Sequence, residues 1–259
     1  MANFEAPQFE RPEKEPSTPY ARLTILRHGE IPRSFQDPNL TEEGVKGVES
    51  TANTIKEHLR ENEDIYIISS PTRRTRQTAE ILAATLEVGE DKERITHLIK
   101  PMALRDPQKA KEIFDKIETE RDPKRKKLAA TYVDPESTQF DNPAVFEPRE
   151  EIRRRTTLGL QFALRFFGTY HKQMRGGKVP HLISVSHAEV LNPFIKEIFD
   201  IDLEKEGGVD YGEDIEITLP NAEEEKEKIP AQISFRGQIR NVMINKKDGT
   251  IETPSDLEP

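Results

Sequence analysis

The stretch Arg22-Leu-Thr-Ile-Leu-Arg-His-Gly-Glu30 joins a short run of strand-forming residues to an abrupt polar ending. Two later stretches have the same form. Asp64–Ser69 runs into a cluster rich in Ser, Thr and Arg, and His181–Ser186 runs directly into His187. Each run is short, apolar and rich in β-branched residues, which is typical of a buried strand. The sequence therefore predicts strands that carry polar side chains at their carboxyl ends.

Helix-like patterns separate these strands. Thr41 is placed to cap a helix that runs to about Arg60, and further helices are predicted over 73–86 and 189–199, with a third strand over 95–99. Because strands and helices alternate, the expected fold class is α/β. We expect a three-layer sandwich with a mostly parallel central sheet and helices on both faces.

A long helical insertion interrupts this alternation at residues 105–175 and predicts a cap over the sheet. Within it, apolar residues fall on one face of a helix from Arg149 to Tyr170. Two extended strands are expected near the C-terminus, over 213–219 and 231–245.

The chain of 259 residues is long enough for one sizeable core, which we place at residues 20–247. Residues 1–19 contain four prolines among charged residues and predict a disordered leader. Residues 248–259 carry four acidic residues and no basic residue, which predicts an acidic tail.

The composition excludes several classes of protein. The chain has no cysteine, so disulfides and thiol chemistry are excluded. It has no apolar run near the length of a membrane-spanning helix, and its first residues are polar, unlike a secretory signal. The net charge of −9 argues against a protein that coats nucleic acid. We expect a cytoplasmic protein without nucleic-acid or membrane partners, and the oligomeric state stays open.

The negative charge is concentrated in one region. Residues 202–228 hold 11 acidic and 3 basic residues, whereas the predicted cap holds 16 basic and 12 acidic residues. A basic cap would attract phosphorylated substrates, although charges on solvated helix faces explain the same count.

The three polar clusters are expected to meet. In an open α/β sheet, ligands bind beyond the carboxyl ends of the strands, and each cluster follows such an end. Together the clusters supply Arg27, His28, Ser70, Arg74 and His187.

These motifs resemble the histidine phosphatase superfamily, which includes the phosphoglycerate mutases. Its members carry Arg-His-Gly after a strand, then Leu-Thr-x-x-Gly, Ser-Ser-Pro-x-x-Arg-x-x-Gln-Thr-Ala and a late Ser-His. The same four elements occur here in the same order, at 27–29, 40–44, 69–79 and 186–187. The resemblance spans about residues 22–200.

The resemblance implies a role for each of these side chains. His28 is the nucleophile that forms a covalent phosphohistidine, Arg27 and Arg74 bind the phosphate, and His187 supports the transferred group. This chemistry suits the residue types, because a neutral imidazole is a competent nucleophile and arginine grips phosphate oxygens in pairs. Such a pocket needs no metal and no cofactor.

Three further residues are candidates for substrate binding. Ser70 either donates to phosphate or caps the next helix, and Arg33 either reaches the site or is an ordinary loop charge. Ser34 stands near a position where mutases and sugar phosphatases place Asn. The loop from Ile31 to Asn39 is shorter than theirs, which disfavours a mutase.

The general acid is where the sequence departs from the family. Many members place a Glu after the third strand, but the matching position here is Lys100. Glu189 follows the late histidine, as the acid does in a distant branch, and is our candidate proton donor. It is equally placed to sit in the first turn of the next helix. Asp106 is a third candidate, and an enzyme with no acid would favour phosphoamidates.

The sequence therefore predicts a metal-independent phosphatase that hydrolyses phosphomonoesters or phosphoamidates through His28. Its partner would be a phosphorylated small molecule or a phosphoprotein. The alternatives are a non-catalytic interaction protein with the same fold and, with less support, a phosphoglycerate mutase-type phosphotransferase.

Overall fold

A central sheet with helices on both faces organises the molecule. The computed structural model describes residues 20–32, 37–120, 140–173, 177–203, 205–220 and 227–253. Within them the sheet has eight strands in the order β3-β2-β4-β1-β5-β6-β7-β8. The strands are β1 (Ala21–Arg27), β2 (Glu63–Ser69), β3 (Glu93–Ile95), β4 (Val179–Ser186), β5 (Asp214–Leu219), β6 (Lys228–Phe235), β7 (Gln238–Asn245) and β8 (Ile251–Glu252).

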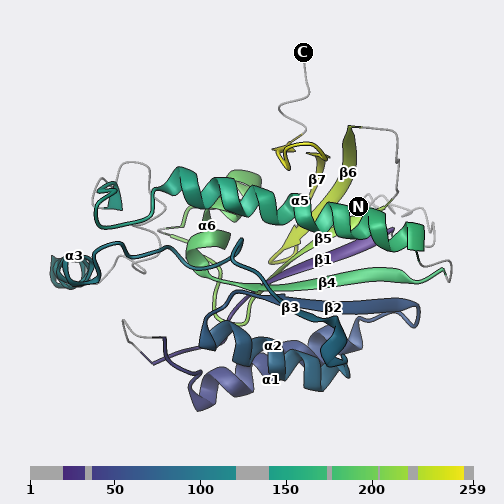
Figure 1. The fold of residues 1–259 in the computed structure, drawn as a ribbon, viewed down its shortest axis with the longest axis horizontal. Helices are drawn as coiled ribbons and strands as arrows, with labels where there is room; N and C mark the ends of the chain where they lie inside the picture. Colours follow the sequence, from purple (N-terminus) through teal and green to yellow (C-terminus); the bar gives the residue numbers. More distant parts are fainter. Residues whose placement is uncertain are drawn as a thin grey trace, which may run out of the picture.

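Four of the helices described form the two outer layers, and α3 stands at one end of the molecule (Figure 1). The helices are α1 (Glu42–Glu57), α2 (Arg73–Leu86), α3 (Pro107–Glu120), α5 (Arg149–Gln173) and α6 (Ala188–Phe199), with a 3-10 turn, η1, at Glu90–Lys92. Figure 1 shows α1 and α2 below the sheet and α5 and α6 above it. The predicted three-layer α/β sandwich is confirmed.

The half of the sheet formed by β3, β2, β4 and β1 is parallel. Helical crossovers link these strands, as parallel neighbours require. All eight residues of β4 are buried, which is typical of a central strand covered on both faces. The carboxyl ends of the parallel strands lie on the side of the molecule where α3 stands (Figure 1).

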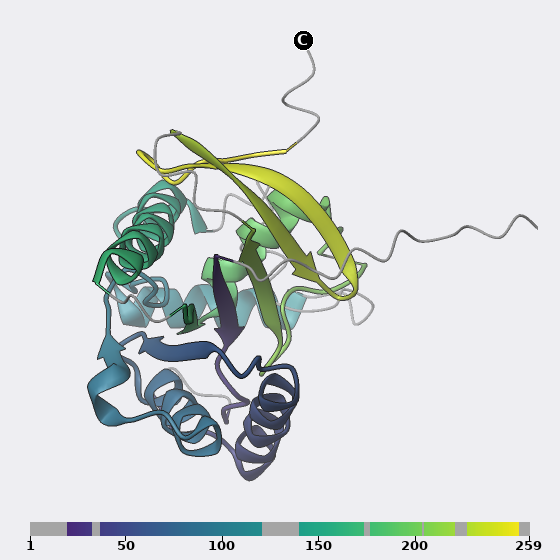
Figure 2. The ribbon, with the colours of Figure 1, turned by 90° about the vertical axis from the view of Figure 1, so that its right-hand side faces the viewer.

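The other half of the sheet is antiparallel, from β5 to β8. The single strand expected over 231–245 is wrong, since these residues lie in a β6–β7 hairpin. At its turn Arg236 and Gly237 have φ angles of 47° and 73°, and two consecutive left-handed residues reverse the chain tightly. The hairpin arches over the sheet beside α5 (Figure 2).

Two other boundaries differ from the sequence prediction. The third strand covers 93–95 and not 95–99, because the following residues turn away and their carbonyl groups bond to the side chains of Arg155 and Ser186. The acidic segment from Asp248 is not all tail, because Ile251 and Glu252 pair with β7 as β8. Residues 1–19 and 254–259 lie outside the described residues.

Helix α1 begins where the sequence predicts. The hydroxyl oxygen of Thr41 accepts a hydrogen bond from the backbone N–H of Gly44 at 2.9 Å, which caps the first turn. Gly44, Val48 and Ala52 are buried at four-residue spacing and face the sheet. The helix ends at Glu57, three residues before the expected Arg60, where His58 is the C-cap.

A polar network is buried at the amino end of the parallel strands. Arg22 of β1 bonds to Glu63 at 2.6 Å and to Glu216 at 2.8 Å. The ring of His181 lies 3.0 Å from Glu63 and 2.8 Å from the hydroxyl of Thr24. These contacts join β1, β2, β4 and β5, so the network holds the two halves of the sheet together.

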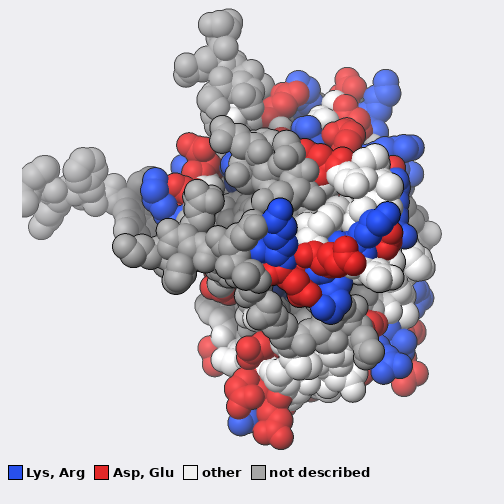
Figure 3. Space-filling model, turned by 90° about the vertical axis from the view of Figure 1, so that its left-hand side faces the viewer, with Lys and Arg blue, Asp and Glu red and all other residues white. Residues whose placement is uncertain are grey.

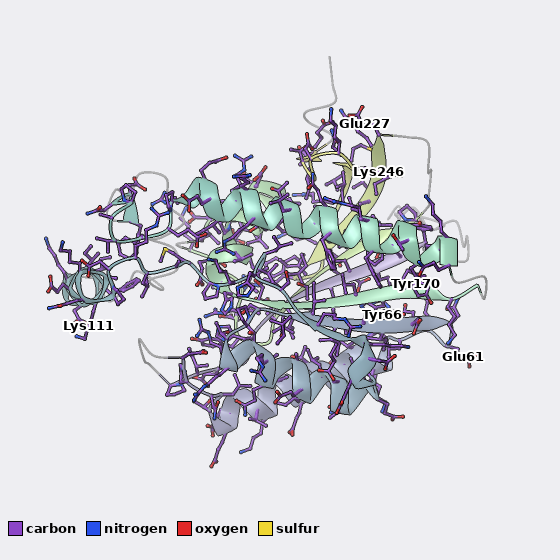
Figure 4. All side chains as sticks on the ribbon, in the orientation of Figure 1. Glu61, Tyr66, Lys111, Tyr170, Glu227 and Lys246 are labelled. Atoms are coloured by element: carbon purple, nitrogen blue, oxygen red, sulfur yellow. The ribbon has the colours of Figure 1, made fainter. Side chains whose placement is uncertain are left out.

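Helix α5 crosses the whole upper face of the sheet. At its far end, Tyr170 points down toward Tyr66 of β2 (Figure 4), and the two rings pack edge to face with centroids 6.0 Å apart. The hydroxyl of Tyr170 donates to Asp64 at 2.8 Å. Burial together with this carboxylate raises the pKa of Tyr170 beyond its usual range. These contacts fix α5 on the sheet.

Helix α3 projects from the end of the molecule where the parallel strands finish. Lys111 lies on this helix (Figure 4) and pairs with Asp115 at 2.6 Å. Charges of both signs are intermixed over the described part of this face (Figure 3). The most basic stretch of the predicted cap, residues 121–127, lies outside the described residues.

Within the described part of the chain, the helices lack the combination of length and apolar character that crossing a membrane requires.

Candidate active site

Three strand ends bring the predicted site together. In the sheet register Arg27 lies opposite Ser186, and Ser69 lies opposite Val185, so β1, β2 and β4 finish at the same level. The residues that follow them therefore meet. The rings of His28 and His187 are 5.1 Å apart, and the hydroxyl of Ser70 lies 2.7 Å from Nε2 of His187.

His28 is held in the tautomer that a nucleophile needs. Its Nδ1 lies 2.7 Å from the carbonyl oxygen of Gly29, and since a carbonyl only accepts, Nδ1 carries the proton. Its Nε2 has no hydrogen-bond partner within the described residues. A neutral imidazole in this tautomer presents the Nε2 lone pair.

The surroundings keep His28 neutral. Burial lowers its pKa to about 3, and the positive charges of Arg27 and Arg74 contribute to the shift. The bond to Gly29 opposes these effects only in part. At neutral pH the ring is therefore an uncharged base.

Arg27 lies beside His28 and is held on two sides. It donates to the carbonyl of Val209 at 2.6 Å, and its guanidinium carbon lies 3.9 Å from the ring centroid of Tyr211. Burial lowers the pKa of Arg27, and the acidic groups nearby, Tyr211 and Glu189 first, oppose that shift. The cation–π contact keeps the guanidinium in place beside the histidine.

Arg74 comes from the first turn of α2. Its guanidinium pairs with Asp37 at 3.1 Å, and the backbone N–H of Arg73 donates to the other oxygen of the same carboxylate at 2.8 Å. The Arg74 side chain is only 14% exposed. Arg74 also contributes to lowering the pKa of both His28 and His187, so its charge is felt at both rings.

Three nitrogen atoms around His28 are buried without a hydrogen-bond partner among the described residues. They are Nε of Arg27, Nε of Arg74 and Nδ1 of His187. Buried polar groups are nearly always paired, so three orphans in one pocket need a reason. An oxyanion bound between them would satisfy all three.

His187 is completely buried and is fixed by hydroxyl groups. Ser70 bonds to its Nε2 and, at 2.8 Å, to the hydroxyl of Thr75, which in turn donates to the carbonyl of Ser70 at 2.9 Å. Burial lowers the pKa of His187 well below its usual range. The proximity of His28 disfavours protonation of both rings at once, and the positive charge of Arg74 adds to the shift. The structure therefore places Ser70 against His187. Ser70 does not cap α2, because the N-cap position of that helix is Thr72.

The remaining motif residues hold the turn that carries His28. The hydroxyl of Thr78 accepts the backbone N–H of Gly29 at 3.1 Å. A Cβ on Gly29 would lie 2.6 Å from the Val48 side chain, and a Cβ on Gly44 would lie 2.2 Å from the carbonyl oxygen of Glu30. The two glycines let helix α1 and the Arg-His-Gly turn touch backbone to backbone.

Glu189 lies in the first turn of α6, near the loop that follows β3. Its carboxylate accepts the N–H of Met102 at 3.3 Å. The same loop is held by Arg155, which donates to the carbonyls of Leu98 and Lys100 and pairs with Glu147 at 2.9 Å. Lys100, which stands where the sequence comparison leads us to expect an acid, therefore lies in the loop that Glu189 contacts.

The other candidates stand apart from this pocket or outside the description. Asp106 accepts the N–H of Lys109 at 3.1 Å and caps the exposed start of α3. Arg33 and Ser34 lie outside the described residues. Within the described part of the chain, His, Asp and Glu side chains do not gather in any group of three that could hold a metal ion.

A comparison with family models identifies the part of the chain that carries the first three motifs. Residues 23–100 match the histidine phosphatase superfamily (branch 1). The resemblance predicted from the sequence is confirmed. A search of curated protein sequences found no match.

Solved structures share the fold of this chain over most of their length. Mycobacterial glucosyl-3-phosphoglycerate phosphatase is 16% identical with a TM-score of 0.57, covering 84% of this chain and 98% of its own. Its complex with inorganic phosphate is 17% identical with a TM-score of 0.55, covering 84% and 97%. A Mycobacterium tuberculosis open reading frame product, Rv3214, is 20% identical with a TM-score of 0.52, covering 84% and 97%. At these identities the likeness is one of fold.

Three residues of the site were not found from the sequence. Tyr211 covers Arg27, and Asn192 inside α6 accepts the N–H of Val209 at 2.9 Å, which positions the carbonyl that Arg27 uses. The sequence counts Arg155 among the basic residues of the cap, but its side chain is buried and donates hydrogen bonds to the loop after β3. All three act through tertiary contacts, and neither composition nor local spacing signals them.

Proposed function

We propose that this protein is a metal-independent phosphatase that transfers the phosphoryl group of its substrate to Nε2 of His28. The observation that carries the proposal is a set of three buried nitrogens, on Arg27, Arg74 and His187, around a neutral histidine; among the described residues these nitrogens and Nε2 of His28 have no hydrogen-bond partner. The match to the histidine phosphatase superfamily and the fold shared with a phosphatase that binds inorganic phosphate support it.

In the first step Nε2 of His28 attacks phosphorus, and the bond from phosphorus to the leaving oxygen breaks. The arginines and His187 stabilise the charge that spreads over the equatorial oxygens. Glu189 in its protonated form gives its proton to the leaving oxygen. In the second step water attacks the phosphorus of the phosphohistidine, and the bond from phosphorus to Nε2 breaks, so that the imidazole regains its lone pair. The proton of the water returns to Glu189, and inorganic phosphate leaves.

The first test removes the nucleophile. Hydrolysis of p-nitrophenyl phosphate is measured in excess chelator for the wild type and for His28→Ala. We expect the variant to lose roughly a thousandfold or more in kcat, since the covalent route is closed. His58→Ala is the control, because His58 is exposed at the end of α1 and its ring lies 2.7 Å from the carbonyl oxygen of Thr54, away from the pocket.

The intermediate is tested directly by quenching the reaction with labelled substrate. Label that stays on the wild-type chain in alkali, is released in acid and is missing from His28→Ala supports a phosphoramidate on this residue. Equal turnover by His28→Ala and the wild type refutes the nucleophile. Absence of turnover on aryl, alkyl and phosphoamidate substrates refutes the enzyme and favours the interaction role.

The role of Glu189 is tested through the leaving group. An acid matters most for poor leaving groups, so Glu189→Gln is expected to slow alkyl phosphates roughly a hundredfold and p-nitrophenyl phosphate far less. Steady-state kcat for both substrates checks this. Equal slowing of both substrates, together with a lower unfolding temperature, contradicts proton donation and indicates that Glu189 only stabilises the first turn of α6.

A further inference from the structure

A large apolar chamber lies behind the proposed phosphate site, between the sheet and the upper helices. Its volume is about 1250 Å³. Its floor includes Ile25 of β1 and Leu182 of β4, its roof includes Leu160 and Ala163 of α5, and α6 supplies Phe194. Cavities of this size and lining are typical of sites for small apolar molecules.

The chamber begins at the site itself. Glu189 is in its wall, and the same carboxylate is close enough to Arg27 to raise the pKa of that guanidinium against the effect of burial. Ile25 and Ser184 of the chamber lie only a few residues before Arg27 and His187 on their strands. Glu189 is the residue that the chamber shares with the proposed site, since Arg27, His28, Arg74 and His187 are not in its wall.

The chamber's other walls indicate an uncharged occupant. The charged residues of the lining are of both signs, three arginines and four acidic residues: Arg149, Arg153, Arg240, Glu150, Glu189, Glu197 and Asp200. Where α5 and α6 face each other, Arg153 pairs with Glu197 at 3.7 Å. Farther along α5, Phe162 of the chamber wall is 43% exposed. An uncharged aliphatic group that binds along the apolar part of this lining would lose water without burying a charge of its own.

We propose that the chamber binds an uncharged, extended apolar leaving group, so that the substrate is a phosphate monoester of an aliphatic alcohol. The inference rests on the proposed function. The phosphate is held at His28, the ester oxygen lies next to Glu189, and the chain continues between the sheet and α5.

The test compares n-alkyl phosphates from ethyl to octyl, whose leaving groups have nearly the same acidity. Buried methylene groups contribute at most about fourfold each. We expect kcat/KM to rise steeply with chain length in the wild type. A series in which octyl phosphate is hydrolysed no better than ethyl phosphate overturns the proposal.

A variant that fills the chamber gives a second readout. A Cβ on Gly159 of α5 would lie 3.5 Å from Ile99 and 3.8 Å from Leu98, so a larger side chain enters the chamber without a backbone clash. Gly159→Leu is expected to abolish the preference for octyl over ethyl phosphate. Gly168→Leu is the matched control, because a Cβ there meets nothing within 4 Å and the residue is not in the chamber wall.

Calorimetric titration with 1-octanol separates this proposal from the proposed function. Octanol carries no phosphate, so we expect His28→Ala to bind it as tightly as the wild type does. Gly159→Leu fills the chamber and is expected not to bind octanol. If no phosphate ester is hydrolysed but octanol binds in this pattern, the result supports the chamber as an apolar binding site and refutes the proposed phosphatase activity. If phosphates are hydrolysed and octanol binds nowhere, the chamber proposal fails and the phosphatase stands.

Discussion

The buried imidazole of His28 ties catalysis and stability to the same protonation state. In an unfolded chain a histidine titrates near 6.5, whereas burial and the neighbouring arginines lower the pKa of folded His28 to about 3. Between these values the unfolded state binds a proton that the folded state does not. Stability contributed by the neutral ring is therefore complete above about pH 6.5 and is lost as the pH falls toward 3.

This linkage gives a prediction at the residue scale. From pH 6.5 to pH 5, His28 alone is expected to remove about 2 kcal/mol from the free energy of unfolding, to within a factor of two. His28→Asn, which does not titrate, should lose correspondingly less over the same interval. Urea denaturation at the two pH values checks this. Equal losses in both proteins would show that the folded ring is not held neutral.

Single residues were predictable where a motif surrounds them. His28, Arg27, Arg74 and His187 lie together because each lies at or shortly after a strand end, and strand ends are readable from short apolar runs. Tyr211 was not predictable, because it reaches Arg27 from a loop far along the chain. A contact between distant loops leaves no local pattern in the sequence.

At the scale of elements, the contact between α1 and the Arg-His-Gly turn decides where His28 stands. The backbone N–H of Thr41 donates to the carbonyl of Glu30 at 2.9 Å, and Gly44 lies against the same peptide group. The Leu-Thr-x-x-Gly motif is therefore structural. Its threonine caps the helix, and its glycine lets the helix approach the turn.

Gly44→Ala is predicted to damage both folding and activity. The added methyl group would stand 2.2 Å from the Glu30 oxygen, so helix and turn must separate. We expect a loss of about 2 kcal/mol or more in unfolding free energy, and a fall in kcat of at least roughly tenfold as His28 shifts. Thermal unfolding and phosphate hydrolysis measure the two effects.

Gly47→Ala on the same helix is the control. A Cβ there meets nothing within 4 Å, so the substitution is expected to stabilise the helix by up to about 1 kcal/mol through propensity alone. Similar behaviour of the two variants would contradict a role for Gly44 in seating the turn.

Elements were predicted best where local signals mark both ends. Helix α2 begins at Arg73 and ends at Leu86, as the pattern indicates. The β6–β7 hairpin was missed because its turn is Arg236-Gly237, and only the glycine signals a reversal. The two residues of β8 form a strand only because β7 lies beside them, which a local reading cannot show.

At the scale of the whole molecule, the antiparallel half of the sheet supplies one wall of the site. Arg236 at the β6–β7 turn bonds Glu213 through two nitrogens, at 2.6 and 2.8 Å, and donates to the carbonyl of Gly208 at 2.8 Å. It thereby holds the loop whose residues Val209 and Tyr211 contact Arg27. The hairpin thus acts on the phosphate site from a distance.

Arg236→Ala is predicted to loosen this loop without touching the reacting groups. We expect KM for a phosphate monoester to rise several-fold, with kcat changed less, because Arg27 loses order before substrate binds. Gln238→Ala, exposed on the same hairpin, should leave both constants unchanged. A fall in kcat alone, with KM constant, would contradict a role in ordering the loop.

Strand β1 is the seam between the two halves of the sheet, pairing with β4 on one side and β5 on the other. Both partners are distant in the sequence, because β4 begins 152 residues after β1 ends. The strand that leads into His28 therefore gains its neighbours only through contacts of long sequence separation, which form slowly during folding. Phosphate affinity would then report that these long-range pairings have formed, because the pocket needs the ends of both β1 and β4.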